Sequence, residues 1–302
     1  MRDRRRVTVA IGLVVCAAAA RCARSGSETP GAIGPTPGLP PAAAHVLVGA
    51  GDIGDCRTAG PAMTATLIDA LAGTVFTLGD NAYPSGTAKD YADCYAPQWG
   101  RHKARTRPVA GNHEYEVPAA AAYFAYFGAS AAPPAGYYSY DLGAWHIVAL
   151  NSNIAMDAGS PQASWLRDDL TASASRCTLA YWHHPLFSSG QNGDTLAARP
   201  LWTILYEAGA EIVMSGHDHD YERFAPQDPL GRSDPARGIR EFVVGTGGAP
   251  PYAFARVREN SEMRLSGQFG VLRLTLVSDG YQWEFVTAPG TAISDSGAGR
   301  CH

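Results

Sequence analysis

The chain has 302 residues, of which 24 are basic and 28 are acidic, so its formal net charge at pH 7 is −4. Residues 1–24 hold six arginines and one aspartate, and the remainder therefore carries a net charge of −9. This excess of acidic side chains argues against nucleic acid or an anionic membrane as a nonspecific partner. The length agrees with one globular domain preceded by a short extra segment.

The first residues have the composition of a secretory signal peptide. Four arginines within 2–6 precede an apolar run over 7–20 that ends in small residues. This run is shorter than the ~20 residues that span a bilayer, so we expect no membrane anchor and no stable membrane association after cleavage. Residues 25–44 are rich in proline and glycine and predict a disordered linker. We therefore expect a secreted protein with a signal peptide at 1–24, a linker at 25–44, a domain at 45–290 and a C-terminal tail at 291–302.

Strands and helices alternate along the rest of the chain. Apolar, β-rich runs predict strands at 46–49, 74–78, 108–110, 147–150, 179–182 and 211–214. One helix is expected at 61–72, with Pro61 in its first turn. A second helix should begin after Ser160, which would cap it. A third should end near Ala208, because Gly209 is a typical helix stop. Near the C-terminus, runs at 271–277 and 281–287 flank Ser278-Asp279-Gly280, which predicts a hairpin. This alternation predicts an α/β fold.

Five short polar clusters follow five of these apolar runs. They are Gly51-Asp52-Ile53-Gly54, Gly79-Asp80-Asn81-Ala82-Tyr83, Gly111-Asn112-His113-Glu114, His183-His184-Pro185 and Gly216-His217-Asp218-His219. A single Gly-Asp or His-x-His is a weak signal, because such pairs recur by chance in turns. Together the clusters bring carboxylate, phenol, amide and imidazole donors to strand ends. That donor set predicts a hydrolytic site with two metal ions ~3.5–4 Å apart.

In order and content, the clusters resemble the motifs of the calcineurin-like metallophosphoesterases. The resemblance covers roughly 45–287, and Tyr83, three residues after Asp80, narrows it to the purple acid phosphatase branch. The continuation of the last cluster into Tyr221-Glu222-Arg223 is also similar to that branch. The chain is similar to the short single-domain form, without the β-sandwich domain of plant relatives. The resemblance implies a four-layer α/β/β/α sandwich with two mixed sheets and the metals at strand ends.

The resemblance also implies which residues bind each ion. The first ion would be held by Asp52, Asp80, Tyr83 and His219, and the second by Asp80, Asn112, His183 and His217, with Asp80 as the bridge. A phenol has a pKa near ~10 and ionises at neutral pH only beside a strong Lewis acid, which favours Fe(III) at the Tyr83 site. The second ion would be Zn, Mn or Fe(II). The alternative for Tyr83 is a packing role beside Pro84.

Such a centre would hydrolyse phosphate monoesters by attack of a metal-bound hydroxide. The resemblance implies that His113 contacts the phosphate or the leaving-group oxygen. The alternative role for this side chain is to support the loop that carries the metal ligands. Family members usually carry one or two further histidines shortly after the His183 position, whereas 185–216 contains none and Asn192 takes about that place. An amide can hydrogen-bond a phosphate oxygen but gives no useful proton, so an acidic pH optimum is in doubt and esters with good leaving groups are favoured. His184 should face away from His183 on an extended segment, with a structural role or a distant phosphate contact.

Four cysteines follow the signal peptide, and an even number in an exported chain implies disulfides, although three connectivities are possible. They are Cys56, Cys94, Cys177 and Cys301. The loops that carry Cys56 and Cys94 must be neighbours if Asp52 and Asp80 share a metal. We therefore favour Cys56 with Cys94 and Cys177 with Cys301.

Several alternatives remain open. Within the same fold the protein could be a phosphodiesterase or a nucleotidase, with loops 84–107, 115–137 and 186–200 choosing the small-molecule phosphate ester. The aromatic residues of the second loop could stack on a substrate, but a helical aromatic core is favoured; they are Tyr115, Tyr123, Phe124, Tyr126 and Phe127. A non-catalytic, metal-dependent phosphate-binding protein predicts loss of a ligand or of His113, and neither is lost. A structural or adhesion module would not explain the clusters. The sequence does not decide the second metal or the oligomeric state.

Overall fold

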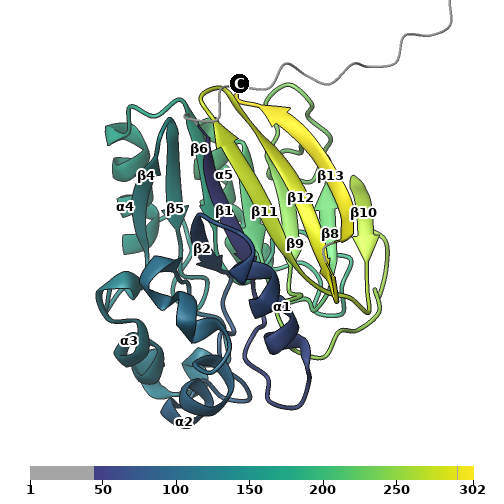
Figure 1. Cartoon of the computed structure of the whole chain (residues 1–302). Coiled ribbons are helices and arrows are strands. Elements are labelled where there is room, and N and C mark those ends of the chain that lie inside the picture. The colour runs from purple at the N-terminus through teal and green to yellow at the C-terminus, as the bar shows by residue number, and fades with distance from the viewer. Residues whose placement is uncertain (1–43, 291) are drawn as a thin grey trace, which may run out of the picture. The chain divides into compact units, whose positions relative to one another are not determined.

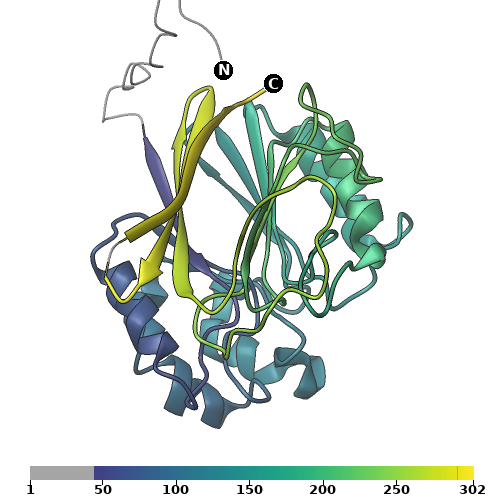
Figure 2. The ribbon, with the colours of Figure 1, turned by 90° about the vertical axis from the view of Figure 1, so that its right-hand side faces the viewer.

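A computed structural model of the protein describes residues 44–290 and 292–302. The predicted signal peptide and all of the predicted linker except Ala44 lie outside these residues. In the described part, two mixed β-sheets pack face to face with helices on their outer sides (Figures 1 and 2). The structure thus confirms the α/β sandwich. None of the helices described is long and apolar enough to cross a bilayer.

The first sheet has six strands in the order β13-β12-β11-β1-β2-β3. Its strands are β1 (His45–Ala50), β2 (Thr74–Thr77), β3 (Thr106–Arg107), β11 (Phe269–Val277), β12 (Gly280–Ala288) and β13 (Ala292–Arg300). Strands β1, β2 and β3 are parallel, whereas β11, β12 and β13 form an antiparallel meander joined to β1. The predicted hairpin is confirmed, because β11 and β12 are connected through Ser278 and Asp279.

The second sheet has seven strands in the order β10-β8-β9-β7-β6-β5-β4. Its strands are β4 (Tyr138–Leu142), β5 (Trp145–Ala149), β6 (Cys177–Tyr181), β7 (Ile212–Ser215), β8 (Tyr221–Phe224), β9 (Arg240–Val244) and β10 (Ser261–Leu265). The central strands β5, β6, β7 and β9 are parallel. Such strands are covered on both faces, which explains why every residue of β6 is buried.

Alternate residues of β6 and the residue that follows it, Trp182, lie in the two cores of the domain. Leu179 and Tyr181 lie in the large core between the sheets. Ala180 and Trp182 lie in a second core beneath the helices α4 and α5. The alternation follows from the period of two in a strand, and it fixes which face of the sheet each helix covers.

The helices vary from regular α-helices to single turns. The α-helices are α1 (Gly60–Asp69), α2 (Ala88–Asp90), α3 (Ala121–Phe127), α4 (Pro161–Ala172) and α5 (Arg199–Glu207). Shorter or irregular turns are η2 (Tyr91–Tyr95), η3 (Trp99–Arg105), η4 (Glu114–Glu116), η5 (Pro118–Ala120), η6 (Gly128–Ala131) and η7 (Leu196–Ala198). The Ser160 hydroxyl accepts a hydrogen bond from the Ala163 N–H and caps α4 as predicted, and Gly209 follows the end of α5 with a positive φ of 77°.

Most boundaries lie within three residues of the prediction, and α1 ends at Asp69 rather than at residue 72. Two elements differ more. The third strand lies at 106–107 rather than at 108–110, because Pro108 has no N–H to add to the ladder. The predicted C-terminal tail is wrong for 292–300, which form β13 at the edge of the first sheet. Asp295 of β13 accepts hydrogen bonds from Tyr221 and Arg223 of the other sheet, so this strand is part of the domain.

Aromatic side chains fill the space between the short helices of 88–131. Tyr123 and Phe127 are buried, and Tyr126 stacks on Tyr91 with ring centroids 4.7 Å apart. Phe127 also meets the Tyr95 ring edge-on at 5.6 Å. This arrangement confirms the helical aromatic core, in which Tyr123 and Phe127 are buried and Tyr115, Phe124 and Tyr126 are partly buried.

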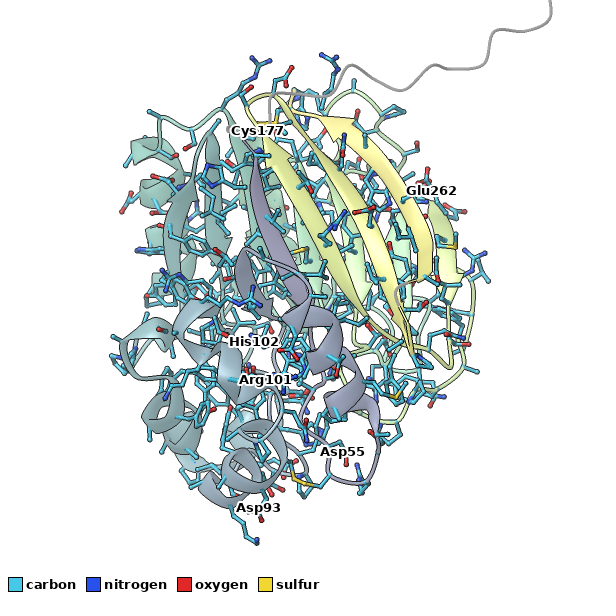
Figure 3. The ribbon with its side chains drawn as sticks, in the orientation of Figure 1. Asp55, Asp93, Arg101, His102, Cys177 and Glu262 are labelled. Atoms are coloured by element: carbon cyan, nitrogen blue, oxygen red, sulfur yellow. A yellow bond between two sulfur atoms is a disulfide. The ribbon has the colours of Figure 1, made fainter. Side chains whose placement is uncertain are left out.

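Both expected disulfides are present. Cys56 is bonded to Cys94 across a sequence separation of 38 residues, next to the first two polar clusters. Cys177 is bonded to Cys301 across 124 residues and joins the two sheets at the end of β6 that lies far from Asp55 (Figure 3).

Candidate metal centre

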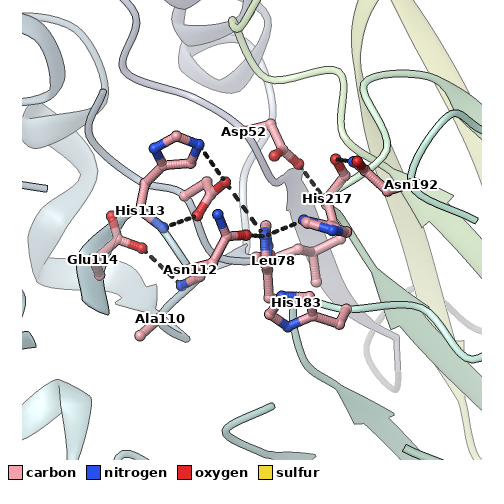
Figure 4. Close-up of polar contacts among 12 residues, drawn as sticks. Asp52, Leu78, Ala110, Asn112, His113, Glu114, His183, Asn192 and His217 are labelled. Atoms are coloured by element: carbon pink, nitrogen blue, oxygen red, sulfur yellow. Dashed lines mark hydrogen bonds and ion pairs between the residues drawn. The ribbon is translucent and has the colours of Figure 1, made fainter. Parts of the chain in front are cut away.

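The polar clusters meet where strands of both sheets end. Asp52 follows β1, Asp80 follows β2, His183 follows β6 and His217 follows β7. Since β1 and β2 are parallel, and β6 and β7 are parallel, the carboxyl ends of each pair lie at one edge of their sheet. The two edges face one another, and side chains from both sheets converge there (Figure 4).

Four of the predicted ligands form what we call the tyrosine group: Asp52, Asp80, Tyr83 and His219. The Tyr83 hydroxyl oxygen lies 2.9 Å from Asp52 Oδ1 and 3.0 Å from Asp80 Oδ2. It also lies 3.1 Å from His219 Nε2, which is 3.4 Å from Asp52 Oδ1. All four donor atoms therefore surround one point, and Tyr83 belongs to the cluster rather than packing only against Pro84.

The other predicted ligands form the asparagine group: Asp80, Asn112, His183 and His217. His183 Nε2 lies 3.0 Å from Asn112 Oδ1, 3.1 Å from His217 Nδ1 and 3.3 Å from Asp80 Oδ2 (Figure 4). Asp80 Oδ2 therefore belongs to both groups, as expected for a bridging carboxylate. The structure brings together all the residues that the sequence predicts as ligands.

Hydrogen bonds from the rest of the chain fix the ligands in place. His183 Nδ1 lies 2.7 Å from the Leu78 carbonyl oxygen, and His219 Nδ1 lies 2.9 Å from that of Pro250. Because a carbonyl only accepts, each Nδ1 carries a hydrogen, and Nε2 is the nitrogen left to bind a cation in place of a proton. Asp52 turns its second oxygen to the His217 N–H at 2.9 Å.

The backbone at three ligands is left-handed. The φ angles of Asp52, Asp80 and His217 are 59°, 48° and 71°. This conformation turns the chain sharply after β1, β2 and β7, and aspartate tolerates it better than most residues. Glycine is needed beside it: a Cβ on Gly111 would lie 2.1 Å from Asp80 Oδ1, and one on Gly79 would lie 2.6 Å from His183 Nδ1.

Burial and mutual charge shift the protonation of these groups. Burial alone would raise the pKa of Asp80, but the neighbouring His183 and His113 hold it well below its usual range. Burial lowers the pKa of His183, yet Asp80 and Asp52 outweigh this effect and raise it to about 9. Burial and Asp52 and Asp80 raise the pKa of the Tyr83 phenol well above its usual value. The site therefore attracts positive charge at the point where its acceptor atoms converge.

The donor set fits two cations. In each group the other three donor atoms lie within 3.3 Å of one central atom, the Tyr83 hydroxyl oxygen or His183 Nε2, while Nδ1 of His183 and of His219 points outward to a carbonyl oxygen. Lone pairs held this close repel one another unless a proton or a cation lies between them. Asp52, Asp80 and His183 also satisfy the spacing of a metal-binding triad, with one ligand atom each within 4.8 Å of the others.

His113 lies beside the bridge. Its backbone N–H donates to Asp80 Oδ1 at 2.9 Å, and its Nε2 lies 3.7 Å from Asp80 Oδ2. Its Nδ1 is 2.5 Å from the Pro84 carbonyl oxygen and 3.2 Å from Glu116 Oε1. The side chain is 28% exposed, so it borders the centre without being enclosed in it.

Glu114 is a site residue to which the sequence reasoning gave no role, although it ends the third cluster. It is fully buried, and one carboxylate oxygen accepts hydrogen bonds from the backbone of Asn81 and Ala82. The other oxygen accepts from Gly111 N–H at 2.7 Å (Figure 4). Glu114 therefore ties the loop of Asp80 to the loop of Asn112.

Tyr252 was missed altogether, because it follows no motif. Its ring stacks on His219 with centroids 4.6 Å apart, and its hydroxyl lies 3.0 Å from the His217 carbonyl oxygen. Asn192, expected near the phosphate, donates from its side-chain nitrogen to that same carbonyl at 2.9 Å (Figure 4). Both residues cover the turn that carries His217 and His219.

His184 lies closer to the centre than expected. Its ring centroid is 4.8 Å from that of His183 and 4.4 Å from that of His217. The expectation that the two neighbours face opposite ways is wrong, because the chain bends at 183–184 instead of continuing as a strand. Burial and the two other histidines lower the pKa of His184 far below its usual value.

Comparisons with known proteins agree with this geometry. Purple acid phosphatase 15 of Arabidopsis thaliana is 29% identical over 187 residues, which cover 49% of this chain and 35% of that protein. This chain thus spans about a third of that relative's length.

Two solved structures share the fold. A purple acid phosphatase from yellow lupin seeds superposes with a TM-score of 0.69 at 18% identity, covering 84% of this chain and 53% of that one. GAP50, described as the anchor in the inner membrane complex of Plasmodium, superposes with a TM-score of 0.66 at 14% identity, covering 86% and 90%. The family model described as calcineurin-like phosphoesterase matches residues 46–221, which are more than half of the chain and include all five polar clusters. By this match the chain belongs to the calcineurin-like phosphoesterase family, with relatives in its purple acid phosphatase branch.

Proposed function

We propose that the protein is a phosphatase that holds two metal ions and hydrolyses small phosphate monoesters. The observation that carries the proposal is the sharing of Asp80 Oδ2 between two four-donor groups, 3.0 Å from Tyr83 and 3.3 Å from His183. The tyrosine group would hold the first ion, with Fe(III) favoured by the phenol, and the asparagine group would hold Zn, Mn or Fe(II). The curated relatives of the purple acid phosphatase branch support this reading.

The ions would supply a water of low pKa and neutralise the charge of the phosphate oxygens. The chain's own residues do the positioning. Leu78 and Pro250 carbonyls orient the imidazoles of His183 and His219 so that lone pairs face the ions. Glu114 accepts hydrogen bonds from the loop of Asp80 and from the loop of Asn112, and so holds the two loops together.

His113 is placed to act on the substrate. Its Nδ1 is held by the Pro84 carbonyl, which leaves Nε2 as the atom beside the bridge. From there Nε2 can reach a phosphate or leaving-group oxygen. His113→Ala should therefore lower kcat by about 100-fold while both ions stay bound, in line with the usual contribution of a positioned acid or base. A variant that lost an ion instead would assign His113 to support of the ligand loop.

A second candidate, a non-catalytic binding or anchoring protein, has one observation in its favour. GAP50 has a similar fold, so the fold alone does not establish hydrolysis. Against this alternative, none of the predicted ligands is missing from the two groups.

The test is to measure metal content and turnover on the same purified protein. We expect two ions per chain, and hydrolysis of p-nitrophenyl phosphate that exceeds hydrolysis of bis-p-nitrophenyl phosphate and of nucleotides. The variant Asp80→Asn should lose both properties, whereas Asp69→Asn, a change on the surface of α1, should keep them. Two bound ions without turnover of any ester would establish the binding protein, and faster diester hydrolysis would establish a phosphodiesterase.

We further propose that the protein is exported. The apolar segment at 7–20 and the two disulfides support this, since disulfides persist in oxidising compartments. Fractionation of cells that express the full chain should find the processed protein outside the cytoplasm; an unprocessed, reduced cytoplasmic chain would contradict export.

A further inference from the structure

The histidines around the centre differ in the partner of their outward nitrogen. For His183 and His219 that partner is a carbonyl oxygen, so Nδ1 bears the hydrogen and Nε2 is free to bind a cation. For His184 the partner is a hydroxyl group, Ser152 Oγ, at 2.8 Å from Nδ1. A hydroxyl can donate as well as accept, so a different tautomer becomes possible.

The contacts of Ser152 decide which tautomer His184 adopts. Ser152 Oγ already accepts a hydrogen bond from the His184 backbone N–H at 3.1 Å. Ser152 is buried, and among the described residues His184 Nδ1 is the only acceptor within reach of its hydroxyl hydrogen, so we assign this hydrogen to a bond with Nδ1. Nδ1 therefore holds the lone pair and Nε2 carries the hydrogen. A ring nitrogen that carries a hydrogen does not bind a metal ion, but it can donate a hydrogen bond.

The His184 ring lies beside the asparagine group. The His184 ring centroid is 4.4 Å from that of His217, and one ring nitrogen of His184 lies within 4.8 Å of ring nitrogens of His183 and His217. Within residues 44–290 and 292–302, Nε2 of His184 has no hydrogen-bond partner, although the ring is held by Ser152 on its other side. The backbone is fixed too, because the His184 carbonyl accepts from the Trp182 indole at 2.7 Å.

Asn192 does not supply this donor. Its side-chain nitrogen donates to the His217 carbonyl oxygen and to the Tyr252 hydroxyl, both at 2.9 Å. Those two contacts use both hydrogens of the amide, and the remaining oxygen only accepts. An unesterified phosphate oxygen also only accepts, so it receives no hydrogen bond from Asn192.

We propose that His184 is a substrate-binding residue, with Nε2–H donating to an unesterified phosphate oxygen beside the asparagine group, and that Ser152 positions it by fixing the tautomer. The inference rests on the proposed function, since it places the phosphate at the two ions. His184 would recognise a phosphate oxygen with a free lone pair, and this contact would not depend on the alcohol part of the ester.

The test is calorimetric binding of inorganic phosphate to the metal-loaded protein, with metal content measured on each sample. The matched pair is His184→Asn and His184→Gln, because the asparagine amide reaches about as far as Nδ1 and the glutamine amide about as far as Nε2. We expect His184→Asn to weaken phosphate binding about tenfold, the usual loss for one hydrogen bond to a charged group. His184→Gln should stay within about threefold of the parent, and both variants should retain two ions. His45→Asn, at an exposed position on β1, is the control.

Ser152→Ala provides a second arm that leaves His184 in place. Without the hydroxyl hydrogen the tautomer is no longer fixed, so phosphate binding should weaken by a smaller factor than in His184→Asn. Unchanged binding in both His184→Asn and Ser152→Ala would overturn the inference and leave the proposed phosphatase intact. Loss of an ion from His184→Asn would overturn it by making His184 a ligand. A metal-loaded parent that binds no phosphate would overturn the proposed function as well.

Discussion

The two ends of strand β6 have opposite characters. At its start, Cys177 is bonded to Cys301, and the neighbouring Thr178 N–H donates to the buried Glu211 carboxylate at 2.7 Å. Beyond its end, His183 lies among carboxylate, amide and imidazole acceptors. One end joins the two sheets covalently, whereas the other brings their polar edges together without a covalent bond between the sheets.

This difference explains how the folded protein can tolerate unfavourable contacts at the edge that carries the candidate metal centre. Carboxylate, phenol, amide and imidazole groups that are packed within 3.4 Å of each other are costly to bury unless a proton or a cation lies between them. A crosslink at the far end restricts the unfolded chain and offsets such a cost without entering the site. Changes at the site end should therefore affect ions and turnover, and changes at the far end should affect stability.

The largest effect is expected at the bridge. Asp80→Asn removes the one charge shared by both groups, so the protein should lose affinity for both ions and turnover should fall on the order of a thousandfold or more. Metal analysis and kinetics on p-nitrophenyl phosphate measure this. Retention of two ions with full activity would show that Asp80 is not shared.

Changes at the start of β6, near the Cys177–Cys301 disulfide, should lower stability and leave activity unchanged. The double variant Cys177→Ser, Cys301→Ser should lower the free energy of unfolding by about 3–5 kcal/mol, since the bond closes a long loop, while kcat/KM below the melting temperature stays at the parent value. The matched control is Cys56→Ser, Cys94→Ser, which opens the loops beside Asp52 and Tyr83 and should release metal. Denaturant unfolding and metal analysis compare the two pairs, and equal metal loss from both would remove the distinction between the ends.

Tyr83→Phe tests the tyrosine group alone. Iron-loaded parent protein should absorb in the visible range by charge transfer from the phenolate, and the variant should lose that band. Activity should fall about 10- to 100-fold, less than for Asp80→Asn, because Asp52, Asp80 and His219 remain. Tyr252→Phe removes a phenol that stacks on His219 without facing Asp52 or Asp80, so its absorption should match the parent. If Tyr83→Phe had the same visible spectrum as the parent, the Tyr83 phenol would not be a metal ligand.

The smallest effect is a change in the pH dependence of stability at the far end. Burial raises the pKa of Glu211 from 4.5 to about 7, despite the hydrogen bond from Thr178. The folded protein therefore binds this proton more tightly than the unfolded chain does, and its contribution to stability falls as pH rises from about 4.5 to about 7. Glu211→Gln should remove that part of the slope, measured as melting temperature against pH, with metal binding unchanged. A slope equal to that of the parent would show that Glu211 is ionised throughout.

Most of the candidate ligands can be found in the sequence because they lie just after a local pattern, an apolar run followed by glycine and a polar residue. Asp52, Asp80 and His217 are of this kind, and the structure brings them together. Tyr252 and Ser152 carry no such pattern, and their importance depends on contacts between segments far apart in the chain. Strand β13 was read as a tail because its Gly- and Ser-rich sequence lacks an apolar alternation, and it is held instead by pairing with β12 and by Asp295.

The left-handed backbone at Asp52, Asp80 and His217 limits how this centre can be redesigned. A longer or β-branched side chain at these positions would have to adopt a conformation that such residues disfavour, at a cost on the order of 1–3 kcal/mol each. Asparagine is the replacement that tolerates the same turn, and at the two aspartates it changes the charge without changing the shape of the side chain. An engineer who wants another metal preference should therefore vary Tyr83 and Asn112, whose φ angles are not positive, and leave the three turning residues alone.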